Sequence, residues 1–209
     1  MRRLPHIYSG EEIQRLIQAA TQLPPHGSLR SHTYAALISL LAATGMRVSE
    51  ALGLLLSDVR AEGLLIRKTK FQKTRLVPLH ETAVKGLQQY LACRLKLCPA
   101  GEHVFVYNGG CKLPYWQVNP IFRKLLKSAN LVPESGRAPR LHDLRHTLAV
   151  RALEQSPSGR QRIGQHMLAL ATYMGHVNID STYWYLQSTA ELLSDISAAG
   201  EDVFSGGLA

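Results

Sequence analysis

Four short segments of the chain carry side chains that could act together on a phosphate group. They are Arg47, a basic run over 67–75, a His-x-x-Arg segment at 142–145, and a Gly-His pair at 175–176 followed by Tyr185. Arginine binds phosphate oxygens, histidine and lysine transfer protons, and a phenol oxygen can attack phosphorus. The set indicates phosphoryl transfer. Because carboxylates for magnesium are not grouped in the sequence, we expect no metal.

Arg47 lies in a tight junction between two expected helices. Gly45 is suited to end the first helix, and Ser49 can cap the second. An arginine beside a helix N-terminus is well placed to bind a phosphate, because its guanidinium and the backbone N–H groups both attract anions. Glu50, three residues on, could orient that guanidinium. The alternative is a surface arginine that simply pairs with Glu50.

A run of basic residues links two expected strands. In a hairpin the turn projects beyond the sheet and could enter a groove of DNA, and Lys70 near its tip could donate a proton to a leaving oxygen. The alternative is a solvated basic edge that discourages strand pairing. The run consists of Arg67, Lys68, Lys70, Lys73 and Arg75.

His142 and Arg145 are three residues apart in the first turn of an expected helix, so their side chains share one face. The histidine can exchange a proton near neutral pH, and the arginine is a permanent bidentate ligand for phosphate. The alternative is a helix start with solvated charges.

The Gly-His pair at 175–176 precedes a tyrosine-rich segment. Gly175 would end a helix, and His176 would lie in the following turn. Tyr183 and Tyr185 flank a tryptophan, and such residues are more commonly packed in a core with their hydroxyls satisfied. This segment alone does not decide whether a tyrosine is packed in the core or acts as a nucleophile.

The hydrophobic periodicity predicts a mainly α-helical fold with a small antiparallel β-sheet inserted early, an α+β arrangement. A capping box at 9–12 would open the first helix. Strands are expected over 64–69 and 75–79, with a short extended run at 104–107. Helices are expected at about 10–20, 31–44, 49–56, 81–97, 118–129, 142–154, 167–174 and 189–198, and loops at 133–140 and 156–164.

The composition is that of a basic protein with a core. Lys and Arg exceed Asp and Glu by nine (24 − 15), which favours a polyanionic partner such as nucleic acid, although an ordinary basic protein fits equally well. Three cysteines without zinc-site spacing are expected as reduced thiols in a cytoplasmic protein. We expect no secretory signal and no membrane span, since apolar stretches fall far short of the roughly 20 residues required.

In their order and spacing, the four segments resemble the tyrosine recombinases, also called the phage integrase family. The matching stretches are residues 44–50, 69–79, 141–147 and 175–185, and they cover most of the chain. The segment around 173–186 is most similar to recombinases of site-specific transposons. The resemblance implies the recombinase catalytic fold and a metal-independent DNA strand transferase that works through a 3′-phosphotyrosyl intermediate and needs no cofactor.

The resemblance also implies a role for each matching residue. Tyr185 would be the nucleophile, because it lies nine residues after His176 as the family pattern requires, whereas Tyr183 falls two short. Arg47 and Arg145 would hold the non-bridging oxygens and offset the charge of the transition state.

The remaining catalytic roles concern protons and hydrogen bonds. The resemblance implies Lys70 as the general acid, with Lys73 as the alternative, and His142 as the residue that assists proton transfer with the tyrosine. His176 would donate a hydrogen bond to the phosphate. Supporting residues would be Glu50 and His146, and DNA-binding residues would be Arg67, Lys68, Lys73 and Arg75.

The family pattern predicts one catalytic domain over 1–209, with a core at about 5–188, a C-terminal tail at 189–209, and no N-terminal core-binding domain. The expected partners are double-stranded DNA and either further copies in a homo-tetramer or partner recombinases. Two alternatives stay open. One is a truncated or partner-dependent DNA-binding accessory protein of the same fold, and the other is a type IB topoisomerase-like enzyme.

Overall fold

The computed structural model describes residues 4–67, 74–134, 137–154 and 160–175. Lys68, Lys70, Lys73, His176 and Tyr185 lie outside the described residues, as does the helix expected over 189–198. The chain divides into two compact units, residues 1–148 and 149–209. The expectation of one domain over 1–209 stays a prediction.

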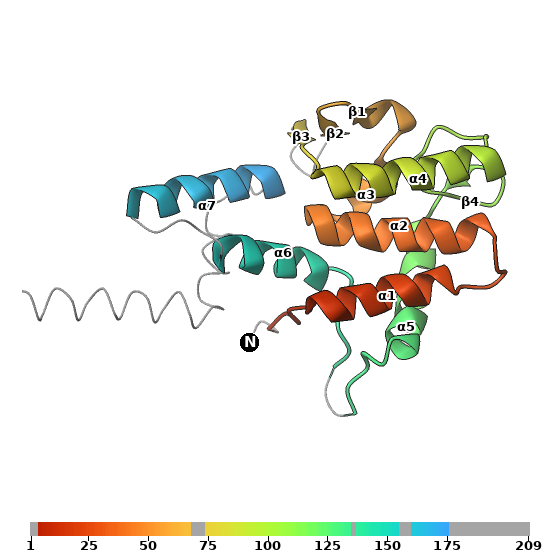
Figure 1. Ribbon diagram of the computed structural model, residues 1–209, viewed down its shortest axis with the longest axis horizontal. Coiled ribbons are helices and arrows are strands. Elements are labelled where there is room, and N and C mark those ends of the chain that lie inside the picture. The colour runs from red at the N-terminus through yellow and green to blue at the C-terminus, as the bar shows by residue number, and fades with distance from the viewer. Residues whose placement is uncertain (1–3, 68–73, 135–136, 155–159, 176–209) are drawn as a thin grey trace, which may run out of the picture. The chain divides into compact units, whose positions relative to one another are not determined.

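Three helices form the main layer of the first unit: α1 (Gly10–Thr21), α2 (Leu29–Thr44) and α4 (Glu81–Leu97). Helix α2 lies between the other two (Figure 1). Its buried residues, which include Ile38 and Leu40, therefore occur on more than one face. Burying each such side chain contributes about 1.5–3 kcal/mol. These helices match their expected bounds to within two residues.

Helix α1 begins with the capping box expected from the sequence. The Ser9 hydroxyl accepts a hydrogen bond from the backbone N–H of Glu12 at 3.1 Å, and the Glu12 carboxylate accepts one from the Ser9 N–H at 2.8 Å. Just before it, Tyr8 donates from its N–H to the Thr147 hydroxyl at 3.0 Å and from its hydroxyl to the Arg140 carbonyl at 3.1 Å. These hydrogen bonds tie the segment before α1 to Arg140 and Thr147, which lie on either side of His142 in the sequence.

The small sheet follows α3 (Val48–Gly53) and a 3₁₀ turn, η1 (Leu56–Asp58). Its antiparallel strands run in the order β1 (Val59–Arg60), β2 (Gly63–Ile66) and β3 (Arg75–Val77), with Ile66 opposite Arg75. The two expected strands are confirmed. Strand β1 was not predicted, because two residues give no periodicity to detect.

A buried arginine secures the loop after α4. The Arg94 side chain is fully buried and donates to the carbonyls of Cys98, Ala100, Gly101 and His103 at 2.7–3.0 Å. That loop in turn joins the chain just after α3, where the N–H of Leu56 donates to the Glu102 carbonyl at 2.7 Å. A short hairpin, β4 (Val106–Tyr107) and β5 (Cys111–Lys112), leads on to α5 (Tyr115–Ser128), which packs against α1 and α3.

Helix α6 (Asp143–Glu154) begins in the first unit, and α7 (Arg160–Met174) belongs to the second. Within the second unit, the His166 ring forms a hydrogen bond with the carbonyl of Ala152 at 2.6 Å. The loop expected over 156–164 is wrong from Arg160 onward. The segment is rich in arginine and glutamine, which favour helix, and Gly164 lowers helix propensity by only about 1 kcal/mol.

None of the helices in the described part of the chain has the length and apolar character that crossing a membrane requires. Among the described residues, no three His, Cys, Asp or Glu side chains gather in a way that could hold a metal ion.

Candidate active site

The junction between α2 and α3 is the centre of the candidate site. Helix α2 ends at Gly45, whose φ of 57° lies in the left-handed region that glycine adopts without strain. The Gly45 carbonyl accepts a hydrogen bond from Nη1 of Arg145 at 2.7 Å. Arg47 follows two residues later as the N-cap of α3, with 26% of its side chain exposed. The fold therefore brings the two predicted phosphate-binding arginines to one junction.

Glu50 binds Arg47 at this junction, as the sequence predicts. Its carboxylate accepts from the Arg47 guanidinium at 2.9 Å and from the Arg47 N–H at 3.0 Å. Arg75 also donates to the carboxylate from both terminal nitrogens, at 3.0 and 2.8 Å. Although burial opposes ionisation of the carboxyl, these hydrogen bonds outweigh it and lower the pKa of Glu50 to about 2. Glu50 is therefore an anion at any pH at which the protein would act.

The start of α6 is fixed by Asp143. This carboxylate is fully buried and accepts from the Arg140 N–H at 2.8 Å and from its guanidinium at 2.9 and 3.1 Å. A carboxylate at a helix N-terminus also interacts favourably with the helix dipole. Asp143 thereby sets the orientation of the helix turn that carries His142 and Arg145.

Two histidines on this turn stack edge to face. The rings of His142 and His146 lie 4.9 Å apart, centre to centre, at 89°. Although part of His142 reaches solvent, the surrounding protein and then the charge of Arg145 lower the pKa of its imidazole. Burial and then His142 lower the pKa of His146 to about 4. At neutral pH both rings are uncharged, so His142 is suited to accept a proton.

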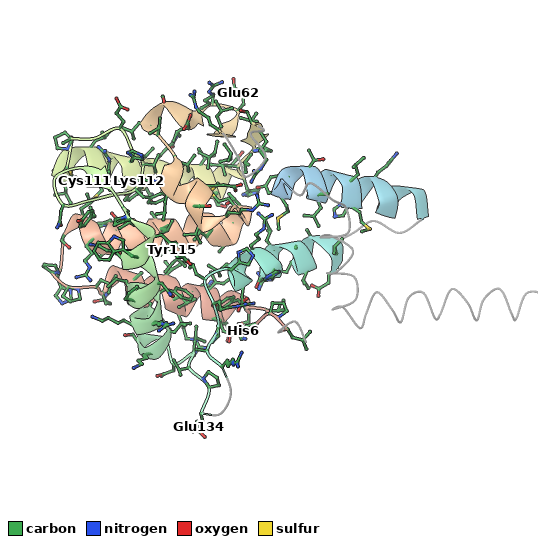
Figure 2. The ribbon with its side chains drawn as sticks, turned by 180° about the vertical axis from the view of Figure 1, so that it is seen from behind. His6, Glu62, Cys111, Lys112, Tyr115 and Glu134 are labelled. Carbon is green, nitrogen blue, oxygen red and sulfur yellow. The ribbon has the colours of Figure 1, made fainter. Side chains whose placement is uncertain are left out.

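A groove of about 930 Å³ opens beside these residues. Arg47 and His142 line one part of it, and one ridge of α5 lines another. The ridge consists of residues spaced four apart, beginning at Tyr115, which Figure 2 shows at the start of α5: Tyr115, Asn119, Arg123 and Lys127. Arg137 and Arg140 add further positive charge. The groove thus has the charge expected of a surface that binds a phosphate backbone.

The ridge on α5 was missed by reasoning from the sequence. The four-residue spacing of Asn119, Arg123 and Lys127, which places three polar side chains on one face of a helix, was the available signal. The helix was expected to start at 118, but it starts at Tyr115.

Of the predicted basic residues of the hairpin, Arg67 and Arg75 are among the described residues, and each pairs with a carboxylate. Arg67 pairs with Asp58, and half of its side chain is exposed. Arg75 pairs with Glu50 and is 11% exposed. The other predicted basic residues of the hairpin, Lys68, Lys70 and Lys73, lie outside the described residues.

Comparison with known proteins decides the family. The pattern of the phage integrase family matches residues 7–191, which include all four chemical segments. The chain belongs to the phage integrase family. The predicted fold, mainly helical with small antiparallel sheets and the catalytic architecture of the tyrosine recombinases, is confirmed.

Individual relatives agree with this assignment. An integrase/recombinase of Sinorhizobium fredii is 36% identical over 203 residues, which cover 93% of this chain and 65% of that protein. The crystal structure of XerA recombinase matches with a TM-score of 0.72 at 26% identity, covering 96% of this chain and 65% of that one. XerH bound to its palindromic difH substrate, a post-cleavage complex, matches with a TM-score of 0.71 at 22% identity, covering 95% of this chain and 54% of that one, and shows the fold alone. The chain spans less than two thirds of the length of these relatives.

Proposed function

We propose that this phage integrase family member is the catalytic domain of a site-specific DNA recombinase that cleaves and rejoins strands through a 3′-phosphotyrosyl bond to Tyr185. The observation that carries the proposal is the hydrogen bond from Arg145 to Gly45. It holds a second guanidinium at the junction from which Arg47 reaches the basic groove. Two arginines at one point can bind both non-bridging oxygens of a single phosphodiester.

The first step exchanges one phosphoester for another. The phenol oxygen of Tyr185 attacks phosphorus, the bond from phosphorus to the 5′-oxygen breaks, and the DNA 3′ end stays on the enzyme. His142, uncharged at neutral pH, takes the phenol proton, and Lys70 gives a proton to the 5′-oxygen. His176 would donate a hydrogen bond to the phosphate. In the second step, a 5′-hydroxyl from a partner strand attacks the phosphotyrosine, so the bond energy is kept and no cofactor is consumed.

Arg47 and Arg145 would supply most of the rate enhancement. The transition state gathers negative charge on the equatorial oxygens of phosphorus, and donors fixed in advance stabilise it without reorganising. Glu50 and Asp143 fix those donors here, Glu50 by binding Arg47 and Asp143 by binding Arg140 at the start of the helix that carries Arg145.

The groove would hold DNA against this centre. Its side chains Arg123, Lys127 and Arg137 line it together with Arg47, so a DNA backbone bound there would reach the Arg47 guanidinium. Arg67, Lys68 and Lys73 in the hairpin are proposed as further contacts. A DNA substrate also makes the cytoplasm the proposed location.

The C-terminal tail at 189–209 is proposed to dock on a neighbouring copy, so that the enzyme acts as a homo-tetramer on DNA or with partner recombinases. Removing residues from Thr189 onward should therefore reduce higher-order complexes on DNA, as measured by gel mobility or mass photometry. Unchanged assembly by the shortened protein would rule this docking out.

A covalent-capture experiment tests the function. Nicked duplexes with a randomised centre, together with the DNA that flanks the gene, are incubated with the protein in EDTA, and adducts are isolated on a denaturing gel. A recovered duplex should form an adduct and should exchange strands with a second copy of itself. Relaxation of supercoiled DNA without exchange would instead indicate a topoisomerase, and binding without any adduct would indicate an accessory DNA-binding protein.

A further inference from the structure

The carboxylate of Glu50 is shared by two arginines from different parts of the sequence. Oε1 accepts from Nη1 of Arg47 at 2.9 Å and from Nη1 of Arg75 at 3.0 Å. Oε2 accepts from the Arg47 N–H at 3.0 Å and from Nη2 of Arg75 at 2.8 Å. Only 6% of the Glu50 side chain is exposed. Four donors on a buried carboxylate make a rigid cluster, because neither oxygen can turn without losing hydrogen bonds.

Arg75 directs its guanidinium into this cluster. Both of its terminal nitrogens donate to Glu50, a bidentate geometry that fixes orientation as well as distance. Its side chain is 11% exposed. These contacts differ from those expected of a residue whose role is to bind DNA.

The position of Arg75 at the start of β3 links the cluster around Glu50 to the small sheet. Arg75 is the first residue of β3 and lies opposite Ile66 of β2. Residues 68–73, which include Lys70, come directly before it, separated only by Thr74. The pair with Glu50 therefore ties the strand that follows Lys70 to the first turn of α3, at which Arg47 lies.

We propose that Arg75 is a positioning residue, which holds Glu50 and through it Arg47 in the orientation that strand cleavage needs, and does not itself contact DNA. The proposal rests on the function proposed above. It replaces the expectation that Arg75 binds DNA with a role inside the protein. Misplacing a group that binds the transition state by about 1 Å can cost about 100-fold in rate, so a residue behind Arg47 can have a large effect on catalysis.

Three roles for Arg75 make different predictions. A DNA contact would lower affinity and reduce the salt dependence of binding by about one phosphate. A purely structural residue would lower stability and leave the cleavage rate of the folded protein unchanged. A positioning residue lowers the cleavage rate at saturating DNA, leaves affinity nearly unchanged, and has little further effect once Glu50 is altered.

The experiment combines Arg75→Gln and Arg75→Lys with Glu50→Gln in a double-mutant cycle. Single-turnover cleavage and DNA binding over a range of salt are measured on the duplex recovered by covalent capture, and stability by urea unfolding. Arg75→Gln should reduce the cleavage rate about 100-fold and change affinity by less than about twofold. The cleavage rate of Arg75→Lys should lie between those of the wild type and Arg75→Gln, because an ammonium keeps the charge but cannot reproduce the bidentate geometry. In the Glu50→Gln background, Arg75→Gln should reduce the rate by less than about threefold.

Arg60→Gln is the matched control, since it removes an exposed positive charge from the same sheet without touching Glu50. It should leave the cleavage rate unchanged. The inference is overturned if Arg75→Gln weakens binding about tenfold with a shallower salt dependence, or if its effect on rate is undiminished in the Glu50→Gln background.

Failure of the proposed function would look different. In that case the wild-type protein forms no adduct on any duplex, while binding to DNA and unfolding can still be measured. The pairing of Arg75 with Glu50 inside the protein is then supported if Arg75→Gln leaves the salt dependence of binding unchanged and its effect on unfolding is non-additive with Glu50→Gln, whereas the role in cleavage is lost together with the proposed function. The inference fails if the salt dependence falls.

Discussion

Arg145 donates a hydrogen bond of 2.7 Å to the carbonyl of Gly45, although 100 residues separate the two in the sequence. Arg145 is 3% exposed, and Gly45 is the left-handed residue that ends α2. This one contact joins α6 to the α2–α3 junction. It thereby relates Arg145 to Arg47, which lies two residues beyond Gly45.

Arg145→Lys should reduce single-turnover cleavage by about 10²–10³-fold at saturating DNA. A lysine keeps the charge but cannot donate to Gly45 and to a phosphate oxygen in the same planar geometry. Arg151→Lys makes the same exchange farther along α6 and serves as the control. Equal losses in the two variants would show that the exchange acts through the helix in general, contrary to our account.

The pH dependence of cleavage should report His142. Because the pKa of His142 is lowered from 6.5, the neutral form that accepts the phenol proton predominates at pH 7 and is lost only as pH falls below 6.5. The single-turnover rate should therefore have an acid limb with its midpoint below 6.5. His142→Gln should reduce the rate by about 10²-fold or more and remove that limb. An acid limb that persists in the variant would assign it to another group.

Stability should fall in acid because of His146. Its pKa is about 4 in the folded protein, against the ordinary histidine value of 6.5, so the unfolded chain binds more protons between these values. The free energy of unfolding should accordingly decrease as pH falls from 6.5 to 4, as measured by urea titration. His146→Gln should flatten the profile in this window, whereas His26→Gln, which removes an exposed histidine, should not.

Salt dependence tests the ridge of α5. Arg123→Ala should weaken DNA binding and reduce the slope of log K against log salt by about 0.9, the value for one lost phosphate contact. Lys124→Ala is a close control, because Lys124 is exposed on the same helix but does not line the groove. If both variants change the slope equally, binding depends on total charge and the groove has no special part in it.

Local features of the site could be predicted from the sequence, and long-range ones could not. The capping box, the end of α2 at Gly45 and the pairing of Arg47 with Glu50 depend on residues within four positions of each other, so their spacing reveals them. The contacts of Arg145 with Gly45 and of Arg75 with Glu50 depend on how helices and strands pack. No periodicity in one segment encodes such pairs.

The basic hairpin shows the same limit. The run over 67–75 predicts strands and a turn, and the sheet confirms the strands. The charge of a basic residue does not reveal whether its side chain points to solvent or into the protein. The structure pairs Arg67 with Asp58 and Arg75 with Glu50. A basic residue can therefore belong to a run that looks suited to DNA and still bind a carboxylate of its own protein.

The most direct test of the account is to locate the covalent bond to DNA. The adduct trapped in EDTA is digested with nuclease and protease, and the modified peptide is sequenced by mass spectrometry. We expect the nucleotide on Tyr185, no adduct from Tyr185→Phe with DNA binding intact, and a normal adduct from Tyr183→Phe. A nucleotide on any other residue, or an adduct that survives Tyr185→Phe, would contradict the account.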